Sequence, residues 1–203
     1  MPIHYHSEDL PADVLFGDSI AVDTETMGLN PSRDALCVVQ LSAGDGDAHI
    51  VQLDRHTYEC PRLMSILADQ SVTKIFHYAR FDLAFLCRYL AVEVTPVYCT
   101  KIASRLARTY TDRHGLKDLC KELLNVDLSK QQQSSDWGAE TLSEAQLSYA
   151  ASDVLHLHKL QAKLDAMLVR EDRQALAAAT FAFLPARAQL DLRGWADQDI
   201  FAH

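Results

Sequence analysis

The sequence lacks the features that mark a membrane protein, a disulfide-stapled protein or a zinc ribbon. Its longest apolar stretch, residues 175–186, is too short to span a bilayer and is interrupted by Pro185. The five cysteines are an odd number, and no two of them stand in a C-x-x-C. The N-terminus is polar and acidic, unlike a signal peptide. We therefore expect a cytoplasmic protein with buried reduced thiols and no membrane partner.

Positive charge is also scarce. The 19 Lys and Arg residues against 28 Asp and Glu residues give a net charge of −9 with histidine neutral. A protein that coats long nucleic acid needs an excess of Lys and Arg to neutralise phosphates. Any nucleic-acid contact should therefore be confined to a small site, or be made through metal ions held by acidic side chains.

What is present is an ordinary apolar content whose periodicity changes along the chain. Hydrophobic residues make up 48% of the 203 residues, enough for a core without staples. Expected strands are 19–23, 36–41, 48–53 and 72–76, of which the first three form a meander; expected helices are 62–68, 79–90, 101–108, 116–124, 143–168 and 171–184. Thr141 or Ser143 should cap the long helix. This order predicts an α/β fold with helices on both faces of the sheet.

Four acids and one phenol stand out by their spacing. Asp23 and Glu25 lie at the end of the first expected strand, and side chains at i and i+2 on a strand point to the same face. Asp82 follows the expected strand 72–76 by one helical turn. Tyr149 and Asp153 are i and i+4 on a helix, so they share a face.

This set of side chains suits two-metal phosphoryl transfer, in which two divalent ions activate a water and stabilise the leaving oxygen. Asp23 would bridge the ions, three further carboxylates would complete the shell, and the Tyr149 hydroxyl would orient or deprotonate the water. Each element taken alone is common: acid-x-acid pairs, first-turn aspartates and Tyr–Asp helix pairs occur on many surfaces. The hypothesis rests on the occurrence of all three patterns in one chain.

Three motifs in this order also resemble those of a known family. D-T-E-T at 23–26, H-x-x-x-F-D at 77–82 and Y-x-x-x-D at 149–153 resemble the exonuclease motifs of the DEDD superfamily, in the Tyr-bearing branch of ribonuclease D. The runs TKIASRLA, HGLKDLCKELL and QSSDW are similar to the same branch. YAASDVLHLH and the tail LDLRGW-x-x-x-DIFAH resemble, more narrowly, the nanoRNase C enzymes.

The resemblance implies a ribonuclease-H-like (DnaQ-like) fold with a mixed central sheet flanked by helices. It implies one 3′–5′ exonuclease domain over residues 1–203, with a catalytic core at about 13–170 and no accessory helical domain. The C-terminal helix and tail at 171–203 are expected to pack on the body or to contact a neighbouring subunit. Asp23, Glu25, Asp82 and Asp153 match the metal carboxylates, and Tyr149 matches the tyrosine of the third motif.

The activity implied is hydrolysis of very short oligonucleotides, dinucleotides preferred, to nucleoside 5′-monophosphates. The implied cofactors are two divalent cations, Mg²⁺ or Mn²⁺. Short single-stranded RNA is the implied partner, with short DNA left open, and self-association as a ring-like octamer is expected. Two alternatives stay open: a ribonuclease D-like enzyme that trims longer or structured RNA, and a non-catalytic nucleic-acid-binding domain.

Further candidates for substrate contact surround the motifs, and each also has a purely structural interpretation. They are Thr24, Gly28, Leu29, His77, Phe81, Gln133 and Trp137, the last two in a polar loop with Lys130. Five basic residues form a local cluster in this acidic chain: Arg105, Arg108, Arg113, His114 and Lys117. Three interpretations of the cluster stay open: it holds a phosphate, it binds acidic residues of a second subunit, or it is ordinary solvated surface.

Overall fold

A computed structural model describes residues 2–129 and 131–203 of the chain. Among them, six strands form one mixed sheet in the order β1-β4-β3-β2-β5-β6. The strands are β1 (Ile3–Ser7), β2 (Ser19–Thr26), β3 (Leu36–Ser42), β4 (Ala48–Gln52), β5 (Thr73–Phe76) and β6 (Val97–Cys99). Strands β2, β3 and β4 form the expected antiparallel meander. The pairs β1–β4, β2–β5 and β5–β6 are parallel.

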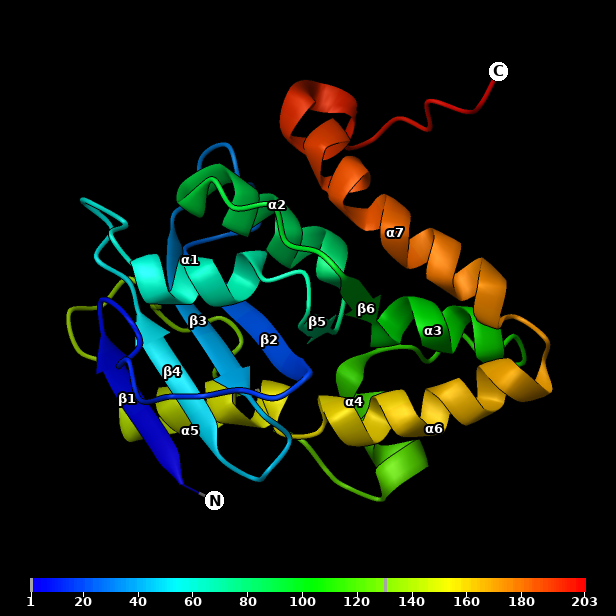
Figure 1. Cartoon of the computed structure of the whole chain (residues 1–203), viewed down its shortest axis with the longest axis horizontal. Helices are drawn as coiled ribbons and strands as arrows, with labels where there is room; N and C mark the ends of the chain where they lie inside the picture. The colour runs from blue at the N-terminus through cyan, green and yellow to red at the C-terminus, as the bar shows by residue number, and fades with distance from the viewer. Residues whose placement is uncertain (1, 130) are drawn as a thin grey trace.

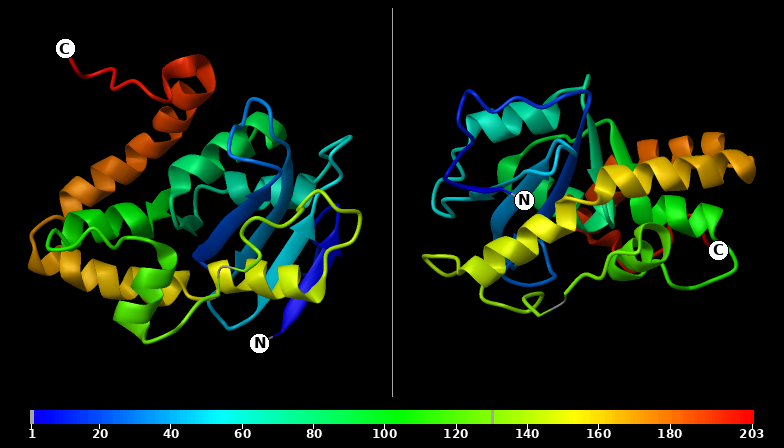
Figure 2. Two further views of the ribbon diagram at one scale, coloured as in Figure 1. Left: turned by 180° about the vertical axis from the view of Figure 1, so that it is seen from behind. Right: turned by 90° about the horizontal axis from the view of Figure 1, so that it is seen from below.

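Helices cover both faces of this sheet, as Figures 1 and 2 show: α1 and α2 lie on one face and α5 lies on the other. The helices are α1 (Pro61–Ala68), α2 (Ala79–Leu90), α3 (Thr100–Ala107), α4 (Leu116–Leu119), α5 (Glu144–Val154), α6 (Leu157–Arg170) and α7 (Gln174–Leu190). Two short π-helical segments continue α4 and α7, namely η1 (Cys120–Leu124) and η2 (Asp191–Trp195). The expected α/β fold with a mixed, helix-flanked sheet is confirmed.

Strand β3 runs through the centre of the core. All seven of its residues are buried, including the polar Gln40 and Ser42. A strand covered on both faces reads as a continuous apolar run rather than an alternation. This burial explains why 36–41 was recognisable as a strand, and it leaves any polar side chain on β3 in need of a partner inside the protein.

Helix α5 begins with a reciprocal N-cap. The Ser143 hydroxyl accepts a hydrogen bond from the Gln146 amide at 3.3 Å, and the Gln146 side-chain oxygen accepts one from the Ser143 amide at 3.0 Å. Such a capping box satisfies two helix-terminal N–H groups at once. Of the two expected caps, Ser143 is therefore the one used.

Three expectations about the elements were wrong. The long helix 143–168 is split into α5 and α6 by a turn at residues 155–156. The last helix begins at Gln174 and continues through Pro185 to Leu190, because the fixed φ of proline suits a helix and only one N–H is lost. Strands β1 and β6 were missed, since β1 is largely polar and β6 spans only three residues. No helix among the described residues is long and apolar enough to cross a bilayer.

Candidate active site

Three elements bring the five motif side chains together. Strand β2 supplies Asp23 and Glu25, α2 supplies Asp82, and α5 supplies Tyr149 and Asp153. All five line one cavity of about 750 Å³. Carboxylate oxygens of Asp23, Glu25 and Asp153 lie within 4.8 Å of one another. Residues separated by as many as 130 positions along the chain thus converge on a single point.

Asp82 is held beside this group by a neighbour on β2. The Thr24 hydroxyl donates a hydrogen bond to Asp82 Oδ1 at 2.7 Å, and both side chains are buried. Asp82 is therefore not the solvated first-turn residue that helix statistics alone would favour. The structure gives Thr24, a candidate for substrate contact, a partner within the protein.

Burial raises the pKa of every carboxyl group in the cluster, and the charges of neighbouring acids add to the rise for Asp23, Glu25 and Asp82. Burial is the largest cause for Asp23, followed by the charges of Asp82, Asp153 and Glu25, and its pKa stands well above the usual range. Burial, aided by the charges of Asp153 and Asp82, raises the pKa of Glu25 to about 9. Burial raises the pKa values of Asp82 and Asp153 to about 7. A bound cation would remove this repulsion.

The donor set fits a hard divalent cation. Four carboxylates converge from β2, α2 and α5, and Mg²⁺ and Mn²⁺ both prefer oxygen ligands. Three of the acids already present oxygens within 4.8 Å of one another, so small side-chain adjustments would close them on an ion. The arrangement of these oxygens thus fits the predicted metal-binding role of the four acids.

Tyr149 faces the carboxylates from α5 and is held by an aromatic neighbour. Burial raises its pKa above the usual range, and the charges of Asp153, Glu25 and Asp23 add to the shift, so the hydroxyl keeps its proton. The Trp137 ring packs 6.0 Å from the Tyr149 ring, centroid to centroid, and is only 2% exposed. Although Trp137 belongs to a polar loop, its indole is buried and forms part of the cavity wall.

The turn after β2 forms the mouth of the cavity. Leu29 is 83% exposed and lines the opening, so it has no structural role in the core. Gly28 also lines the cavity, but its lack of a side chain has a structural reason. A Cβ on Gly28 would lie 2.3 Å from Asp34 Oδ2. That carboxylate accepts a hydrogen bond from the Asn30 amide and thereby closes the turn.

The second motif contributes a histidine with a defined tautomer. The Thr100 hydroxyl has one proton, which it donates to the Phe76 carbonyl at 3.1 Å. We therefore assign His77 Nδ1 as the donor in its 2.9 Å contact with Thr100 Oγ1, which leaves Nε2 as an acceptor. Burial, with a smaller contribution from Lys101, lowers the pKa of His77 to about 3, so the ring stays neutral.

Phe81 packs on a core aromatic ring and also lines the cavity. Its ring packs 4.8 Å from the Phe85 ring, centroid to centroid, and it also lines the cavity. Gln133 is exposed at the opposite rim. Lys130, from the same loop, lies outside the described residues.

Tyr78 and Lys101 also line the cavity, although no motif in the sequence pointed to them. Tyr78 caps α2 in the left-handed region, with φ of 72°, and its ring is 44% exposed. Lys101, at the start of α3, places Nζ 4.0 Å from the centroid of the Tyr78 ring. The contact joins two segments that follow neighbouring parallel strands, so only the sheet order could reveal it.

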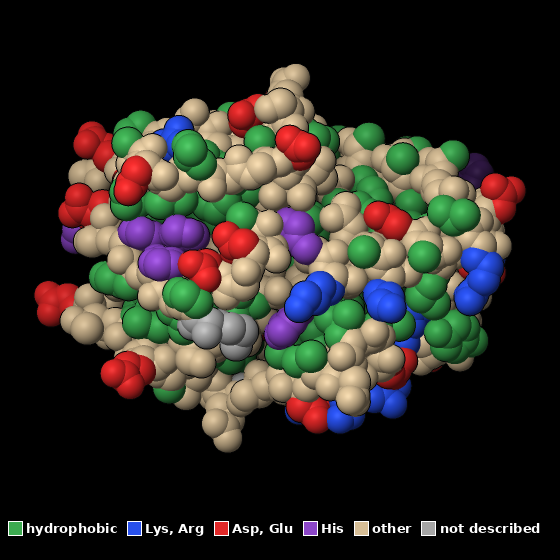
Figure 3. Space-filling model, turned by 60° about the horizontal axis from the view of Figure 1, so that its bottom comes forward, with side chains coloured by type: hydrophobic (Ala, Val, Ile, Leu, Met, Phe, Trp, Pro, Cys, Tyr) green, Lys and Arg blue, Asp and Glu red, His purple; other side chains and the backbone are tan. Residues whose placement is uncertain are grey.

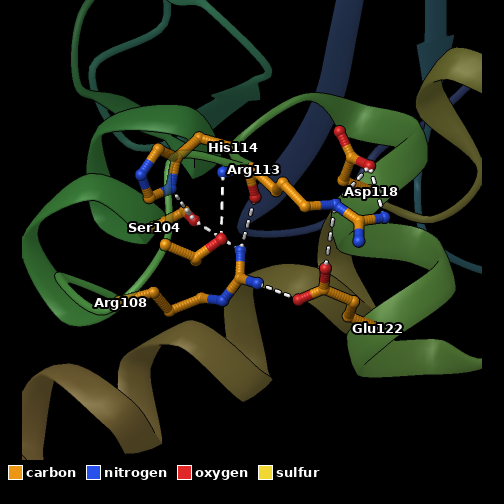
Figure 4. Close-up of polar contacts among 7 residues, drawn as sticks. Ser104, Arg108, Arg113, His114, Asp118 and Glu122 are labelled. Carbon is orange, nitrogen blue, oxygen red and sulfur yellow. Dashed lines mark hydrogen bonds and ion pairs between the residues drawn. The ribbon is translucent and has the colours of Figure 1, made fainter.

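Two of the five members of the basic cluster, Arg108 and His114, belong to the interior of the protein. Arg108 is fully buried and donates to Glu122, to Ser104 Oγ at 3.0 Å and to the Arg113 carbonyl at 2.9 Å (Figure 4). His114 Nδ1 lies 2.8 Å from Ser104 Oγ. None of the three interpretations of the cluster fits Arg108 or His114, because the network joins α3 to the segment that precedes α4.

The same network supports one wall of the cavity. Arg113 pairs with Asp118 at 2.9 Å, and the cavity-lining residues Gly115, Leu116 and Lys117 lie between these two ends. Lys117 is exposed, as is Arg105. On the face shown in Figure 3, most Lys and Arg side chains gather over one half and most Asp and Glu side chains over the other.

The C-terminal tail is fixed to the body at its start. Asp191 accepts hydrogen bonds from Arg80 Nε at 2.5 Å and from Arg187 Nε at 3.0 Å. Further along, Phe201 is 77% exposed, although its ring lies 6.0 Å from that of Phe183. Asp191 thus links the start of the tail to the body, and the end of the tail presents apolar surface to solvent.

Comparison with known proteins places these motifs in a wider group. Residues 6–169 match the family described as 3'-5' exonuclease. Ribonuclease D of Acidiphilium cryptum is 36% identical over 155 residues, which cover 76% of this chain and 39% of that protein. DNA polymerase I of Aquifex aeolicus is 33% identical over 153 residues, which cover 75% of this chain and 25% of that protein. The chain thus spans less than half the length of these curated relatives.

Solved structures of similar size match over the whole chain. Brucella melitensis NrnC bound to pGG is 57% identical, with a TM-score of 0.97 and coverage of 100% of this chain and 99% of that chain. Brucella melitensis NrnC with bound Mg²⁺ is 56% identical, with a TM-score of 0.96 and full coverage of both chains.

Proposed function

Because this chain belongs to the 3′–5′ exonuclease family, in its ribonuclease D-like NrnC branch, we propose that it is a metal-dependent exoribonuclease. Its substrates are very short oligonucleotides, dinucleotides above all, and its products are nucleoside 5′-monophosphates. One observation carries the proposal: oxygens of Asp23, Glu25 and Asp153 converge within 4.8 Å, in one cavity with Asp82 and Tyr149.

Two divalent cations, Mg²⁺ or Mn²⁺, would be held by the four carboxylates of Asp23, Glu25, Asp82 and Asp153. When bound, such ions activate a water molecule and stabilise the leaving oxygen of the phosphodiester. The NrnC structure with bound Mg²⁺ supports magnesium as one of the working ions. Tyr149 keeps its proton in the metal-free protein, which favours a role for its hydroxyl in orienting the attacking water.

The other cavity residues would bind the nucleotides. Leu29 presents an apolar side chain at the mouth, and Phe81 offers a ring on which a base can stack. Base–aromatic stacking contributes about 1–3 kcal/mol and tolerates any base. His77 Nε2 can accept a hydrogen bond from a sugar hydroxyl. Thr24, Gly28, Gln133 and Trp137 would shape the remaining walls.

Three observations support a short substrate. The cavity of about 750 Å³ is in the size range of small-ligand pockets. The net charge of −9 disfavours binding of long strands through phosphates. The NrnC relative was solved bound to pGG, a short oligonucleotide. We also propose that the protein acts in the cytoplasm, accepts short DNA to some extent, and self-associates as an octamer.

The decisive experiment is a time course on labelled RNA of two, three, seven and twenty nucleotides, with Mg²⁺ or Mn²⁺ and with a chelator control. We expect fast, metal-dependent cleavage confined largely to the dinucleotide. Comparable cleavage of the twenty-nucleotide strand would replace the short-substrate proposal with ribonuclease D-like trimming. Saturable binding without hydrolysis of any oligonucleotide would instead indicate a non-catalytic binding domain.

A further inference from the structure

We propose that Gln40 is a positioning residue, which holds the Asp23 carboxylate in the orientation that binds a divalent cation. The inference rests on the proposed function, because it concerns the same metal centre. Gln40 belongs to none of the three motifs. It lies in the middle of β3, where an apolar side chain would be the ordinary choice.

The two side chains are direct neighbours across the sheet. Asp23 of β2 pairs with Gln40 of β3 in the antiparallel register, and Gln40 Nε2 donates a hydrogen bond to Asp23 Oδ2 at 2.8 Å. The Gln40 side chain has no exposed surface, so the bond is shielded from competing water. The bond gives Asp23 Oδ2 a fixed donor and thereby sets the orientation of the Asp23 carboxylate.

The other end of the same amide argues against a role in stability alone. Gln40 Oε1 is buried and has no hydrogen-bond partner among the described residues. A buried acceptor without a partner destabilises the folded protein, whereas an apolar side chain of the same length would not. The unpaired Oε1 of Gln40 therefore lowers the stability of the folded protein. The hydrogen bond from Nε2 to Asp23 explains why a glutamine stands at this position.

A second carboxylate of the cluster is held in the same manner. The Thr24 hydroxyl donates to Asp82 Oδ1 at 2.7 Å and thereby sets the orientation of the Asp82 carboxylate. Both donors are neutral. An amide or a hydroxyl fixes a carboxylate without cancelling the charge that attracts a cation, whereas Lys or Arg at the same position would compete with the ion.

The test replaces Gln40 by methionine, which keeps the length and loses the donor. Gln52→Met is the matched control: Gln52 lies on the neighbouring strand β4 and donates to the Ala139 carbonyl at 2.8 Å rather than to a carboxylate. Mn²⁺ binding to the metal-free proteins is measured by calorimetry, and thermal unfolding is followed by circular dichroism in the presence of a chelator.

We expect Gln40→Met to weaken Mn²⁺ binding about 10- to 100-fold, the usual effect of removing a partner of a metal ligand, without a fall in the melting temperature. Gln52→Met should bind Mn²⁺ like the wild type. In an Asp23→Asn background, Gln40→Met should have no further effect on Mn²⁺ binding, because Gln40 acts through Asp23. If the methionine variant does not fold, Gln40→Leu serves in its place.

Equal Mn²⁺ affinity in the wild type and Gln40→Met would overturn the inference, as would a further loss of affinity in the Asp23→Asn background. Failure of the proposed function has a separate sign, namely wild-type protein that binds Mn²⁺ but hydrolyses no oligonucleotide. Where the wild type is active, the Mg²⁺ concentration for half-maximal rate should rise in Gln40→Met while kcat at saturating Mg²⁺ is largely restored.

Discussion

Four carboxylates share one cavity, and each has a raised pKa, chiefly because it is buried; for Asp23, Glu25 and Asp82 the charges of neighbouring acids add to the rise. Such a cluster is unfavourable in a folded protein unless it is protonated or binds cations. The acids are held together because β2, α2 and α5, which carry them, pack into the core. At the scale of single residues, the negative charges of the four acids therefore define what the site can bind.

Asp23→Asn should abolish turnover while leaving the fold intact. We expect a loss of more than about a hundredfold in rate, because Asp23 is proposed as a shared ligand of the cations. The metal-free variant should melt at a higher temperature than the wild type at about pH 8, since a buried carboxyl group with a raised pKa is removed. Assays of dinucleotide hydrolysis and thermal unfolding check both parts.

Exposed Asp13 provides the control for this substitution. Asp13→Asn should change neither the rate nor the melting temperature. An Asp23→Asn variant with wild-type turnover would rule out Asp23 as a metal ligand.

Leu29→Ala should weaken substrate binding without destabilising the protein. Leu29 is 83% exposed, so its truncation should change the free energy of unfolding by less than about 0.5 kcal/mol. Loss of about 1 kcal/mol of apolar contact with a base corresponds to roughly a fivefold rise in KM. Leu15, which is 79% exposed and does not line the cavity, is the matched control. A similar KM in both variants would show that Leu29 does not touch the substrate.

At the scale of elements, each part of the site depends on how one helix or strand begins or ends. The start of α5 is fixed by the Ser143 capping box, and α5 carries both Tyr149 and Asp153. The segment before α4 is fixed by the buried Arg108 network. The turn after β2 is closed by Asp34, which requires a glycine at position 28. These contacts hold the elements that carry the site in place.

Ser143→Ala should lower the free energy of unfolding by about 1 kcal/mol, the usual cost of losing an N-cap side chain. Thr141→Ala is the control, because Thr141 is exposed and Ser143 is the residue that caps α5. Urea denaturation followed by circular dichroism gives both values. Equal destabilisation by the two substitutions would contradict the assignment of the cap.

At the scale of the whole molecule, charge links folding, metal binding and substrate length. The net charge of −9 and the buried acids both oppose compaction in the absence of cations. The core is nevertheless extensive, with β3 buried along its whole length. Divalent cations should therefore act as stabilising ligands of the folded protein as well as cofactors of the reaction.

The stabilisation by Mg²⁺ should increase with pH. A carboxyl group whose pKa is raised on folding keeps its proton in the folded protein at a pH where the unfolded chain has already lost it. The metal-free protein therefore loses stability as the pH rises above about 4. This loss continues to about pH 7 for Asp82 and Asp153 and to about pH 9 for Glu25. Mg²⁺ displaces these protons. The shift in melting temperature on adding Mg²⁺ should thus be larger at about pH 8.5 than at about pH 6.

Glu25→Gln should reduce this dependence, because it removes the carboxyl group with the pKa of about 9. Thermal unfolding with Mg²⁺ and with a chelator, across that pH range, checks the prediction. A Mg²⁺ shift that is constant or falls with pH would show that the cations do not bind at these acids.

The sequence by itself determined the fold class, the meander, the bounds of α2 and the five motif residues. These features are written in local patterns: strand and helix periodicity, a proline at a helix start, and acids at fixed spacing. The family resemblance added the fold type, which the structure and the comparisons confirm. The metal-ligand roles of the acids and the catalytic role of Tyr149 remain predictions.

Only the tertiary structure decided which side chains are buried and what they contact. Trp137 lies in a polar stretch yet closes the cavity, Arg108 looks like a surface cation yet is fully buried, and Gln40 sits in an apolar strand yet contacts Asp23. Tyr78 and Lys101 meet because β5 and β6 are neighbours in the sheet. Each of these facts depends on packing between segments distant in sequence, and a local pattern carries no information about which segments become neighbours.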